Sequence, residues 1–598
     1  TGNVTLTLAA GALNSNPGTK ISGNLATLTA PGGIDVNTNI TTLTATTTNS
    51  DIKVTEDNTL ALNNINAGTG DVEFDINAGT LTSNAGTSIN GDDLKIEGAG
   101  AITINTNVTT LEASTANSNI TVTETNDLGL NLVNAGTGDI NIGVGGAMTD
   151  NNGDQKNIIG DDVVLAAVNG IGSGDALETT INTLTSTNTN NGIEILDEGG
   201  LTIVAPGIAN TNGLVNITTH SPLNVNANVT AGGNINLTAG DNDSANNDDI
   251  TIAANINIQS TGGDVYLTAG DDITQAAGTG VISAGGGDIY LYAGHDNDGD
   301  GLINIAGKVG SGAENLTMDA DQTITALTNV STLTASTVNS NITVTEDNGL
   351  ALNLVDAGSG DVNITVNAGN LTDNNGATNN LKANDVTLNV VSGDIGTAAD
   401  SIETDIDTLA ITAATNAYIS EDNGIILNNI NVTTLFDLDT GNNGSVTSSA
   451  GTKITGTSVD INADGAVNVN TNITDITVAT SNDNVVVNED NGLAVNTINA
   501  GSGDVTLNLT AGAVTDNNGV TNNITANLLD VTAPGGVDLD TTINTLTADT
   551  SGGNGNINID ETNGLALNNV NAGTGNVTLT LAAGALNSNP GTKISGNL

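Results

Sequence analysis

The chain has 598 residues, and its 8 Lys and Arg against 66 Asp and Glu give a formal net charge of −58 at pH 7. This charge repels phosphate backbones and anionic lipid headgroups, which excludes nucleic acid as a partner. No apolar run is long enough to span a bilayer, so we expect no membrane insertion in this segment. Cysteine is absent, which rules out disulfides and thiolate metal sites.

Hydrophobic residues make up 37% of the chain but aromatic residues only 1%, and there are 75 Gly. Most of the apolar residues are Ala, Val, Ile and Leu, and a disordered acidic chain would be poorer in branched aliphatics. Val, Ile and Thr favour strands, whereas Gly, Asn and Asp favour tight turns. The composition therefore predicts many short strands joined by tight turns.

The first 25 residues are repeated without a change. TGNVTLTLAAGALNSNPGTKISGNL occupies residues 1–25 and returns as residues 574–598, an offset of 573. Such a match is typical of tandem duplication. We interpret residues 1–573 as one period of a larger array and residues 574–598 as the start of the next period.

A shorter repeat unit lies inside this period. The stretch TEDNTLALNNINAGTGDV around Glu56 recurs after 68 residues as TETNDLGLNLVNAGTGDI around Glu124. Further copies lie around Glu346, Glu489 and Glu561, and looser ones lie near Glu421 and Glu198. About eight repeat units of roughly 70 residues are thus predicted to form one continuous solenoid over residues 1–598.

Each repeat unit contains several strand signals. The run NITVTE, residues 119–124, alternates apolar with polar residues, and no stretch shows a helical apolar period. We predict an all-β, elongated parallel β-solenoid with three coils of about 20–26 residues in each unit. Its narrow core would hold small aliphatic residues, and large aromatic residues would not fit easily. Asn residues at equivalent positions are expected to form amide ladders, and Gly68-Thr-Gly-Asp71 to form a tight turn.

Residues 232–310 differ from the rest of the chain. They read GGNINLTAGD, GGDVYLTAGDDITQAAG and GGDIYLYAGHDNDGDGLINIAG, with Gly pairs at 232, 262 and 286. This segment resembles the haemagglutinin-type repeats of filamentous haemagglutinin-like giant bacterial surface adhesins. The resemblance implies a right-handed β-helix, an extracellular or bacterial cell-surface location, and adhesion to cell-surface glycans or to another cell.

Two acidic clusters are candidate calcium sites, and no other cofactor is indicated. In Asp296-Asn-Asp298-Gly-Asp300-Gly301, alternating carboxylates precede a Gly, and Ca²⁺ prefers several such oxygen ligands. An EF-hand loop would place a Glu where Gly307 stands, so a solvated acidic turn remains the alternative. A less regular second cluster contains Asp241, Asp243, Asp248 and Asp249.

Three of the four tyrosines lie in the same variant segment. Tyr290 and Tyr292 are at alternate positions, so in a strand they would share one face, and Tyr266 lies one repeat earlier. They form a candidate sugar-stacking surface. The alternative is ordinary cross-strand cover on a sheet.

Enzymatic activity is not expected. Glu56 and Asp57 could serve glycoside cleavage only as a pair in one cleft, yet the pair recurs from unit to unit, which favours a turn acid that accepts backbone hydrogen bonds. The fold resembles β-helical polysaccharide lyases, which typically use Arg and Lys, but this chain has no Arg and few Lys. Thr-x-Thr pairs such as Thr5-Leu-Thr7 resemble ice-binding solenoids, although their spacing is irregular.

The sequence thus predicts a non-enzymatic structural segment of a giant repetitive extracellular or cell-surface fibre. It would act as a stiff spacer or stalk in adhesion or cell-to-cell contact. The alternative is a self-assembling extracellular filament or sheath subunit. In both cases the expected partners are neighbouring copies of the same repeat, in one chain or stacked end to end.

Overall fold

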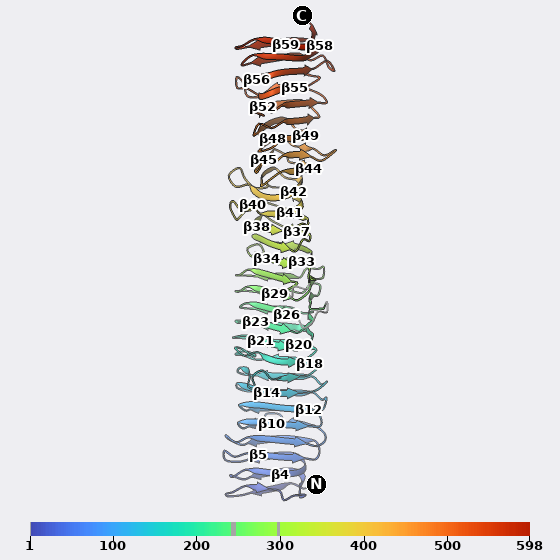
Figure 1. The fold of residues 1–598 in the computed structure, drawn as a ribbon. Coiled ribbons are helices and arrows are strands. Elements are labelled where there is room, and N and C mark those ends of the chain that lie inside the picture. Colours follow the sequence, from blue (N-terminus) through green and yellow to red (C-terminus); the bar gives the residue numbers. More distant parts are fainter. Residues whose placement is uncertain (1, 241–246, 296–298, 598) are drawn as a thin grey trace. The chain divides into compact units, whose positions relative to one another are not determined.

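The computed structural model describes residues 2–240, 247–295 and 299–597. Its contacts divide the chain into an N-terminal body, Thr1–Glu314, and a C-terminal body, Asn315–Leu598, which we describe separately (Figure 1). The regular structure of the described residues is entirely β, and the ladders between named strands are parallel. The predicted all-β parallel β-solenoid is therefore confirmed. Among the described residues there is no helix that could cross a membrane.

The strands of the N-terminal body are β1 (Val4–Thr7), β2 (Leu13–Asn14), β3 (Ile21–Thr29), β4 (Ile34–Thr46), β5 (Ile52–Glu56), β6 (Leu60–Asn66), β7 (Val72–Ile76), β8 (Leu81–Ser83), β9 (Ile89–Asn90), β10 (Asp93–Gly98), β11 (Ile102–Asn107), β12 (Thr110–Thr115), β13 (Ile120–Glu124), β14 (Leu128–Asn134), β15 (Ile140–Val144), β16 (Met148–Asp150), β17 (Ile158–Ile159), β18 (Asp162–Ala166), β19 (Leu177–Thr180), β20 (Thr183–Asn188), β21 (Ile193–Asp197), β22 (Leu201–Asn210), β23 (Val215–Thr219), β24 (Leu223–Val225), β25 (Val229–Ala231), β26 (Ile235–Ala239), β27 (Ile250–Ile252), β28 (Ile258–Ser260), β29 (Val265–Ala269), β30 (Ile273–Gln275), β31 (Val281–Ala284), β32 (Ile289–Ala293) and β33 (Ile303–Val309).

The strands of the C-terminal body are β34 (Asn315–Ala320), β35 (Ile324–Thr328), β36 (Thr332–Thr337), β37 (Ile342–Glu346), β38 (Leu350–Asp356), β39 (Val362–Val366), β40 (Leu371–Asp373), β41 (Leu381–Val390), β42 (Ile402–Ala413), β43 (Asn416–Glu421), β44 (Ile425–Asn431), β45 (Leu435–Thr440), β46 (Val446–Ser448), β47 (Ile454–Thr455), β48 (Ser458–Ala463), β49 (Val467–Asn472), β50 (Asp475–Thr480), β51 (Val485–Glu489), β52 (Leu493–Asn499), β53 (Val505–Leu509), β54 (Ala513–Asp516), β55 (Ile524–Thr532), β56 (Gly536–Asp549), β57 (Ile557–Glu561), β58 (Leu565–Leu581) and β59 (Leu586–Asn597).

Within each body, consecutive strand positions alternate between two parallel ladders. In the N-terminal body, ladder A stacks β4, β6, β8 with β9, β11 and β13. Ladder B stacks β4, β5, β7, β10, β12 and β14. The long strand β4 belongs to both ladders, since Ile34–Thr38 pairs with β5 and Thr42–Thr46 with β6. One coil of the solenoid thus contributes one strand position to each ladder.

This arrangement gives a repeat unit three and a half coils, whereas three were predicted. From Glu56 in β5 to Glu124 in β13, the chain takes seven steps between the ladders, so Glu124 lies in ladder A and Glu56 in ladder B. Asp197 in β21 returns to ladder B. In-register partners are 17 residues apart at Leu94 and Leu111 and 30 residues apart at Ile235 and Val265.

The inward side chains of the two ladders form the core. Strands such as β5 and β7 alternate buried and half-buried residues, as the apolar and polar alternation of their sequences dictates. Large aromatic residues were expected not to fit this core easily, yet Phe74 and Phe436 are both fully buried. Phe436 is in register with Ala417 in the preceding coil, and this small neighbour leaves space for the ring.

Asn side chains at equivalent positions of neighbouring coils form hydrogen-bonded ladders, as the sequence predicts. The Asn151 amide donates to Asn131 Oδ1 at 2.8 Å, and Asn374 donates to Asn353 at the same distance. The predicted tight turn is also present, because Gly68 has a φ of +68°. A Cβ at Gly68 would lie 2.3 Å from Asn49 Oδ1, so the approach of the preceding coil requires glycine.

A buried asparagine that sequence reasoning missed closes one corner of the solenoid. Asn380 donates through Nδ2 to Leu352 O at 3.0 Å and to Asp373 Oδ1 at 2.7 Å, while its Oδ1 accepts the Glu403 N–H at 3.0 Å. Asn157 and Asn523 make the corresponding bonds in their own coils. The spacing Asp-x₆-Asn in the recurring TDNNG segments is the signal that would have revealed them.

Replacing Asn380 by Ala should destabilise the C-terminal body by about 1–3 kcal/mol, because the Glu403 N–H loses its acceptor, and Leu352 O and Asp373 Oδ1 each lose one of two donors. The matched control is Asn379→Ala. Asn379 is the preceding residue and donates to Asp422 Oδ2 in an exposed hydrogen bond, so its loss should cost less than about 0.5 kcal/mol. Urea unfolding of the full chain measures both effects, and equal effects of the two substitutions would contradict the structural role of Asn380.

Candidate functional site

The most regular chemical feature of the chain is a buried carboxylate that recurs from one repeat unit to the next. Its side chains are at most 2% exposed. In every case one oxygen accepts a backbone N–H from the preceding coil, and the other accepts the N–H two residues further along the chain. The seven residues are Glu56, Glu124, Asp197, Glu346, Glu421, Glu489 and Glu561.

Glu421 illustrates this geometry. Its Oε2 accepts the Thr404 hydroxyl at 2.6 Å and the Ile406 N–H at 3.3 Å, and its Oε1 accepts the Asn423 N–H at 3.2 Å. Thr404 and Glu421 are in register on neighbouring coils. The carboxylate therefore satisfies backbone donors where the chain leaves one strand and enters the next tight turn.

These bonds confirm the interpretation of the recurring acid as an acceptor of backbone hydrogen bonds. The structure also separates the two members of the Glu-Asp pair. Glu56 points into the core, whereas Asp57 lies at the surface and forms an ion pair with Lys20. The two carboxylates do not face a common cleft, as glycoside cleavage would need.

Asp197 corrects the alignment of the looser copy near Glu198. Asp197 is fully buried and accepts the Thr179 hydroxyl at 2.7 Å, the Ile181 N–H at 3.1 Å and the Gly199 N–H at 2.9 Å. It therefore takes the place that Glu346 has in its own unit, and Glu198 is an outer residue paired with Lys156. Aligning LDEGGL with TEDNGL would have shown this from the sequence.

Burial changes the acidity of three of these groups. Desolvation raises the pKa of Asp197 and of Glu346, although hydrogen bonds to the ionised form oppose the change. Desolvation also raises the pKa of Glu421 to about 7, with a contribution from the charge of Asp405. Glu421 therefore titrates near neutral pH, far from the ordinary range of a carboxylate.

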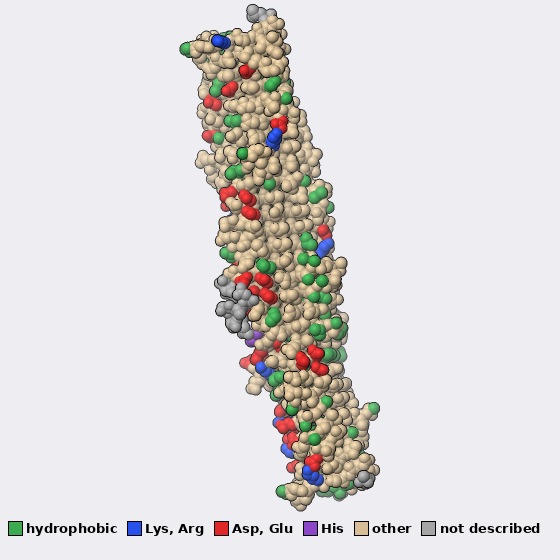
Figure 2. Space-filling view, turned by 90° about the vertical axis from the view of Figure 1, so that its right-hand side faces the viewer, with side chains coloured by type: hydrophobic (Ala, Val, Ile, Leu, Met, Phe, Trp, Pro, Cys, Tyr) green, Lys and Arg blue, Asp and Glu red, His purple; other side chains and the backbone are tan. Residues whose placement is uncertain are grey.

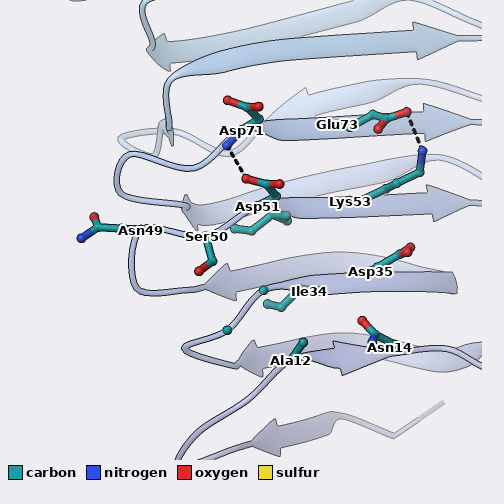
Figure 3. A pocket seen from close by; sticks show the side chains of 13 residues that line it. Ala12, Asn14, Ile34, Asp35, Asn49, Ser50, Asp51, Lys53, Asp71 and Glu73 are labelled. Atoms are coloured by element: carbon teal, nitrogen blue, oxygen red, sulfur yellow. Dashed lines mark hydrogen bonds and ion pairs between the residues drawn. The ribbon is translucent and has the colours of Figure 1, made fainter.

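An open groove of about 570 Å³ lies in the N-terminal body beside β4, β5 and β7 (Figure 3). Lys53 Nζ lies 2.7 Å from Glu73 Oε1, and Asp51 Oδ1 accepts the Asp71 N–H at 3.1 Å. Hydrogen bonding to Glu73 raises the pKa of Lys53. Lys53 is also in register with Asp35, which gives a column of alternating charge. The Lys53 ammonium is thus paired with Glu73 at the surface of the groove.

The tyrosines predicted to form a binding surface lie together on ladder B. The Tyr266 and Tyr290 rings are stacked with centroids 4.6 Å apart and an interplanar angle of 4°, and the Tyr290 and Tyr292 centroids are 6.3 Å apart. Desolvation and the hydrogen bond to Asp264 raise the pKa of Tyr266 to about 12. The stacking of Tyr266 on Tyr290 joins neighbouring strands, as the alternative of cross-strand cover expects. The sugar-stacking surface stays a prediction.

The calcium candidates are only partly described. Asp296 and Asp298 of the first cluster, and Asp241 and Asp243 of the second, lie outside the described residues. Asp300 Oδ1 accepts the Gly301 N–H at 3.0 Å. In the second cluster, the buried Asp248 donates its N–H to Asp271 Oδ2 at 2.8 Å, and Asp249 Oδ1 accepts the Asp272 N–H at 3.1 Å.

Among residues 2–240, 247–295 and 299–597, no group of three His, Cys, Asp or Glu side chains is arranged to hold a metal. Calcium binding by either cluster stays a prediction.

The Thr-x-Thr pairs stack over three coils near the start of the chain. One column of in-register residues on successive coils consists of Thr5, Thr27 and Thr44. The neighbouring column consists of Thr7, Thr29 and Thr46. The following coil places Asn64 and Asn66 in these columns. The array therefore ends after three coils.

Comparison with known proteins gave no match among family models, curated proteins or solved structures.

Glu421→Gln is predicted to flatten the pH dependence of stability. A carboxyl whose pKa rises on folding binds its proton more tightly in the native state, so its contribution is complete below its unfolded pKa of 4.5 and is lost as the pH rises through about 7. Lowering the pH from about 8 to about 5.5 should therefore raise the free energy of unfolding by about 2 kcal/mol through this group alone.

Urea unfolding of the full chain at both pH values measures the difference. The control is Asp422→Asn, which removes the adjacent exposed carboxylate and should leave most of the pH dependence in place. If Glu421→Gln and Asp422→Asn changed the pH dependence equally, Glu421 would not be the titrating group.

Proposed function

We propose that this chain is a non-enzymatic structural segment of a giant repetitive extracellular or cell-surface fibre. In this role the solenoid is a stiff spacer or stalk that supports adhesion or cell-to-cell contact. The proposal rests mainly on one observation. The same arrangement, a buried carboxylate that accepts backbone N–H groups, recurs in repeat units throughout the chain. A catalytic group would be expected once, in one cleft, whereas a residue that stabilises the fold is needed in each unit.

Stiffness follows from the ladders. Each inner strand pairs with the coil before it and the coil after it, so bending opens main-chain hydrogen bonds on one side. The outward residues are mainly Thr, Asn, Ser and Asp. On the face seen in Figure 2, most atoms belong to neither hydrophobic nor charged side chains, and the acidic side chains lie in several small groups. Such a surface is suited to a solvated spacer.

The proposed extracellular or cell-surface location is supported by the resemblance of the variant segment, residues 232–310, to known surface proteins. Residues 232–310 resemble haemagglutinin-type repeats of bacterial surface adhesins, and the tyrosine stack lies within them. Adhesive contact with glycans or another cell is therefore proposed for this segment.

The proposal predicts mechanical resistance. When the full chain is stretched from its two termini in a single-molecule force instrument, its length should stay nearly constant until coils unfold in steps, because extension requires breaking ladder hydrogen bonds. Continuous extension at low force, as shown by a flexible linker, would contradict the spacer function.

A self-assembling extracellular filament or sheath is the second candidate, and it is favoured by the identity of residues 1–25 and 574–598. Sedimentation at rising concentration separates the two functions, since a filament subunit polymerises and a spacer stays monodisperse. The less favoured readings, a polysaccharide-active enzyme and an ice-binding solenoid, would gain support from glycan turnover and from altered ice growth, respectively.

A further inference from the structure

One corner of the N-terminal body departs from the pattern of the other repeat units. In several units the ladder admits one extra residue, an Asn whose Oδ1 accepts the amide of an Asn in the next coil at 2.7–2.8 Å. These residues are Asn63, Asn131 and Asn353. In β22 the ladder instead admits Val204-Ala-Pro-Gly207, between Ile203 and Ile208. Apolar residues thus stand where other units have the Asn ladder.

This segment borders an open groove of about 580 Å³ on β18, β20 and β22. The apolar wall of the groove consists of Val164, which is 42% exposed, the half-buried Val204, and the exposed Ala205 and Pro206. Outward strand positions of this chain are mainly Thr, Asn, Ser and Asp, so aliphatic residues at these positions are unusual. A concave, mainly apolar site of this volume with a few polar groups is typical of a binding site.

A buried hydroxyl lies at the same groove. Thr185 lines the groove and is in register with the outward Val164, yet it is only 5% exposed. Its hydroxyl has no hydrogen-bond partner among the described residues, which is unfavourable for a buried polar group. Rotation about χ1 exchanges the hydroxyl and methyl positions of a Thr side chain. A bound molecule with a polar group at the groove can therefore supply the missing partner.

Negative charge is located at one end of the groove. Asp162 is exposed, is the first residue of β18 and lines the groove, and its Oδ1 accepts the Thr183 hydroxyl at 2.7 Å. The preceding Asp161 adds a second carboxylate beside it. The next outward residue of β18 is Val164. The groove therefore has an acidic end followed by an apolar middle.

We propose that this groove docks a partner protein through an extended segment in which a Lys is flanked by aliphatic residues. The aliphatic side chains pack on Val164, Val204 and Pro206, and the ammonium group pairs with Asp162. A main-chain group of the segment bonds to the Thr185 hydroxyl. The net charge of −58 attracts a basic segment and repels an acidic one. The inference adds a partner to the proposed function and holds for a spacer and for a filament alike.

A second copy of this chain is a poor source of such a segment. The chain has 8 Lys and Arg against 66 Asp and Glu, so two copies repel each other. Five of its lysines already form ion pairs with carboxylates, namely Lys20, Lys53, Lys95, Lys156 and Lys453. The partner is therefore a different protein with a basic surface.

Disulfide capture of a peptide tests the docking, because the chain contains no Cys of its own. Thr187 is exposed and lines the groove four residues beyond Thr183, which is in register with Asp162. Thr187→Cys therefore places a thiol roughly 13 Å from Asp162 along the strands. The probe Ac-Cys-Val-Lys-Val-NH2 spans this distance with its Lys side chain. Mass spectrometry of the intact full chain measures the captured fraction at a fixed ratio of reduced to oxidised glutathione.

Matched peptides carry Gln in place of Lys, or Ser in place of both Val residues. The reference position is Thr343→Cys, an exposed residue in register with Thr325 and Asn363. Dividing by the result at Thr343→Cys removes the general attraction of a cation to this acidic chain. The Lys peptide should then be captured about 3–5-fold more than the Gln peptide at Thr187→Cys. The Ser peptide should be captured about 10-fold less than the Val peptide.

Two substitutions separate the contributions of charge and apolar contact. Asp162→Asn should abolish the preference for the Lys peptide, and Val164→Ser should lower capture of the Val peptide about 3-fold. Both replaced side chains are exposed, and circular dichroism verifies that each variant retains its β-structure.

Equal normalised capture of the Lys and Gln peptides at Thr187→Cys would overturn the docking proposal, as would a preference for Lys that persists in Asp162→Asn. The stretching experiment uses the unsubstituted chain without a peptide, so the two proposals fail independently.

Discussion

The structure depends on one constraint: a single coil can neither bury its aliphatic residues nor satisfy its backbone polar groups without a neighbouring coil. The parallel ladders meet this need within the strands, but the corners leave backbone N–H groups that no strand accepts. The buried carboxylates and the buried asparagines supply acceptors at these corners. Glu421 accepts the N–H groups of Ile406 and Asn423, and Asn380 accepts that of Glu403.

The half-integral length of the repeat unit has a structural consequence. Because a unit takes seven steps between the ladders, Glu346 and Glu489 lie in one ladder of the C-terminal body, and Glu421 and Glu561 lie in the other. A motif copied by duplication must therefore fit both ladders. The carboxylates of Glu346 and Glu421 accept equivalent backbone N–H groups, so the turn that follows the strand has the same hydrogen-bond donors in both ladders.

Much of this architecture could be predicted from the sequence because it depends on local patterns. Alternation in NITVTE, the Asn pairs and the Gly68 turn each report a feature of one strand or one tight turn. The burial of Phe74 and Phe436 could not be predicted, because the space for a ring depends on residues in the neighbouring coil, such as Ala417. Similarly, the direction of Glu56 into the core and of Asp57 to the surface depends on which N–H groups the preceding coil presents.

Charge and ladder contacts act along different directions of the solenoid. The outward Asp and Glu residues contribute to a net charge of −58, so the sides of two copies repel each other at low ionic strength. Coil-to-coil contact instead uses aliphatic side chains, backbone hydrogen bonds and ion pairs such as Lys20 with Asp57. Stacking of coils within the chain therefore uses short-range contacts in the narrow core and along the ladders, whereas the acidity acts laterally through the outward residues.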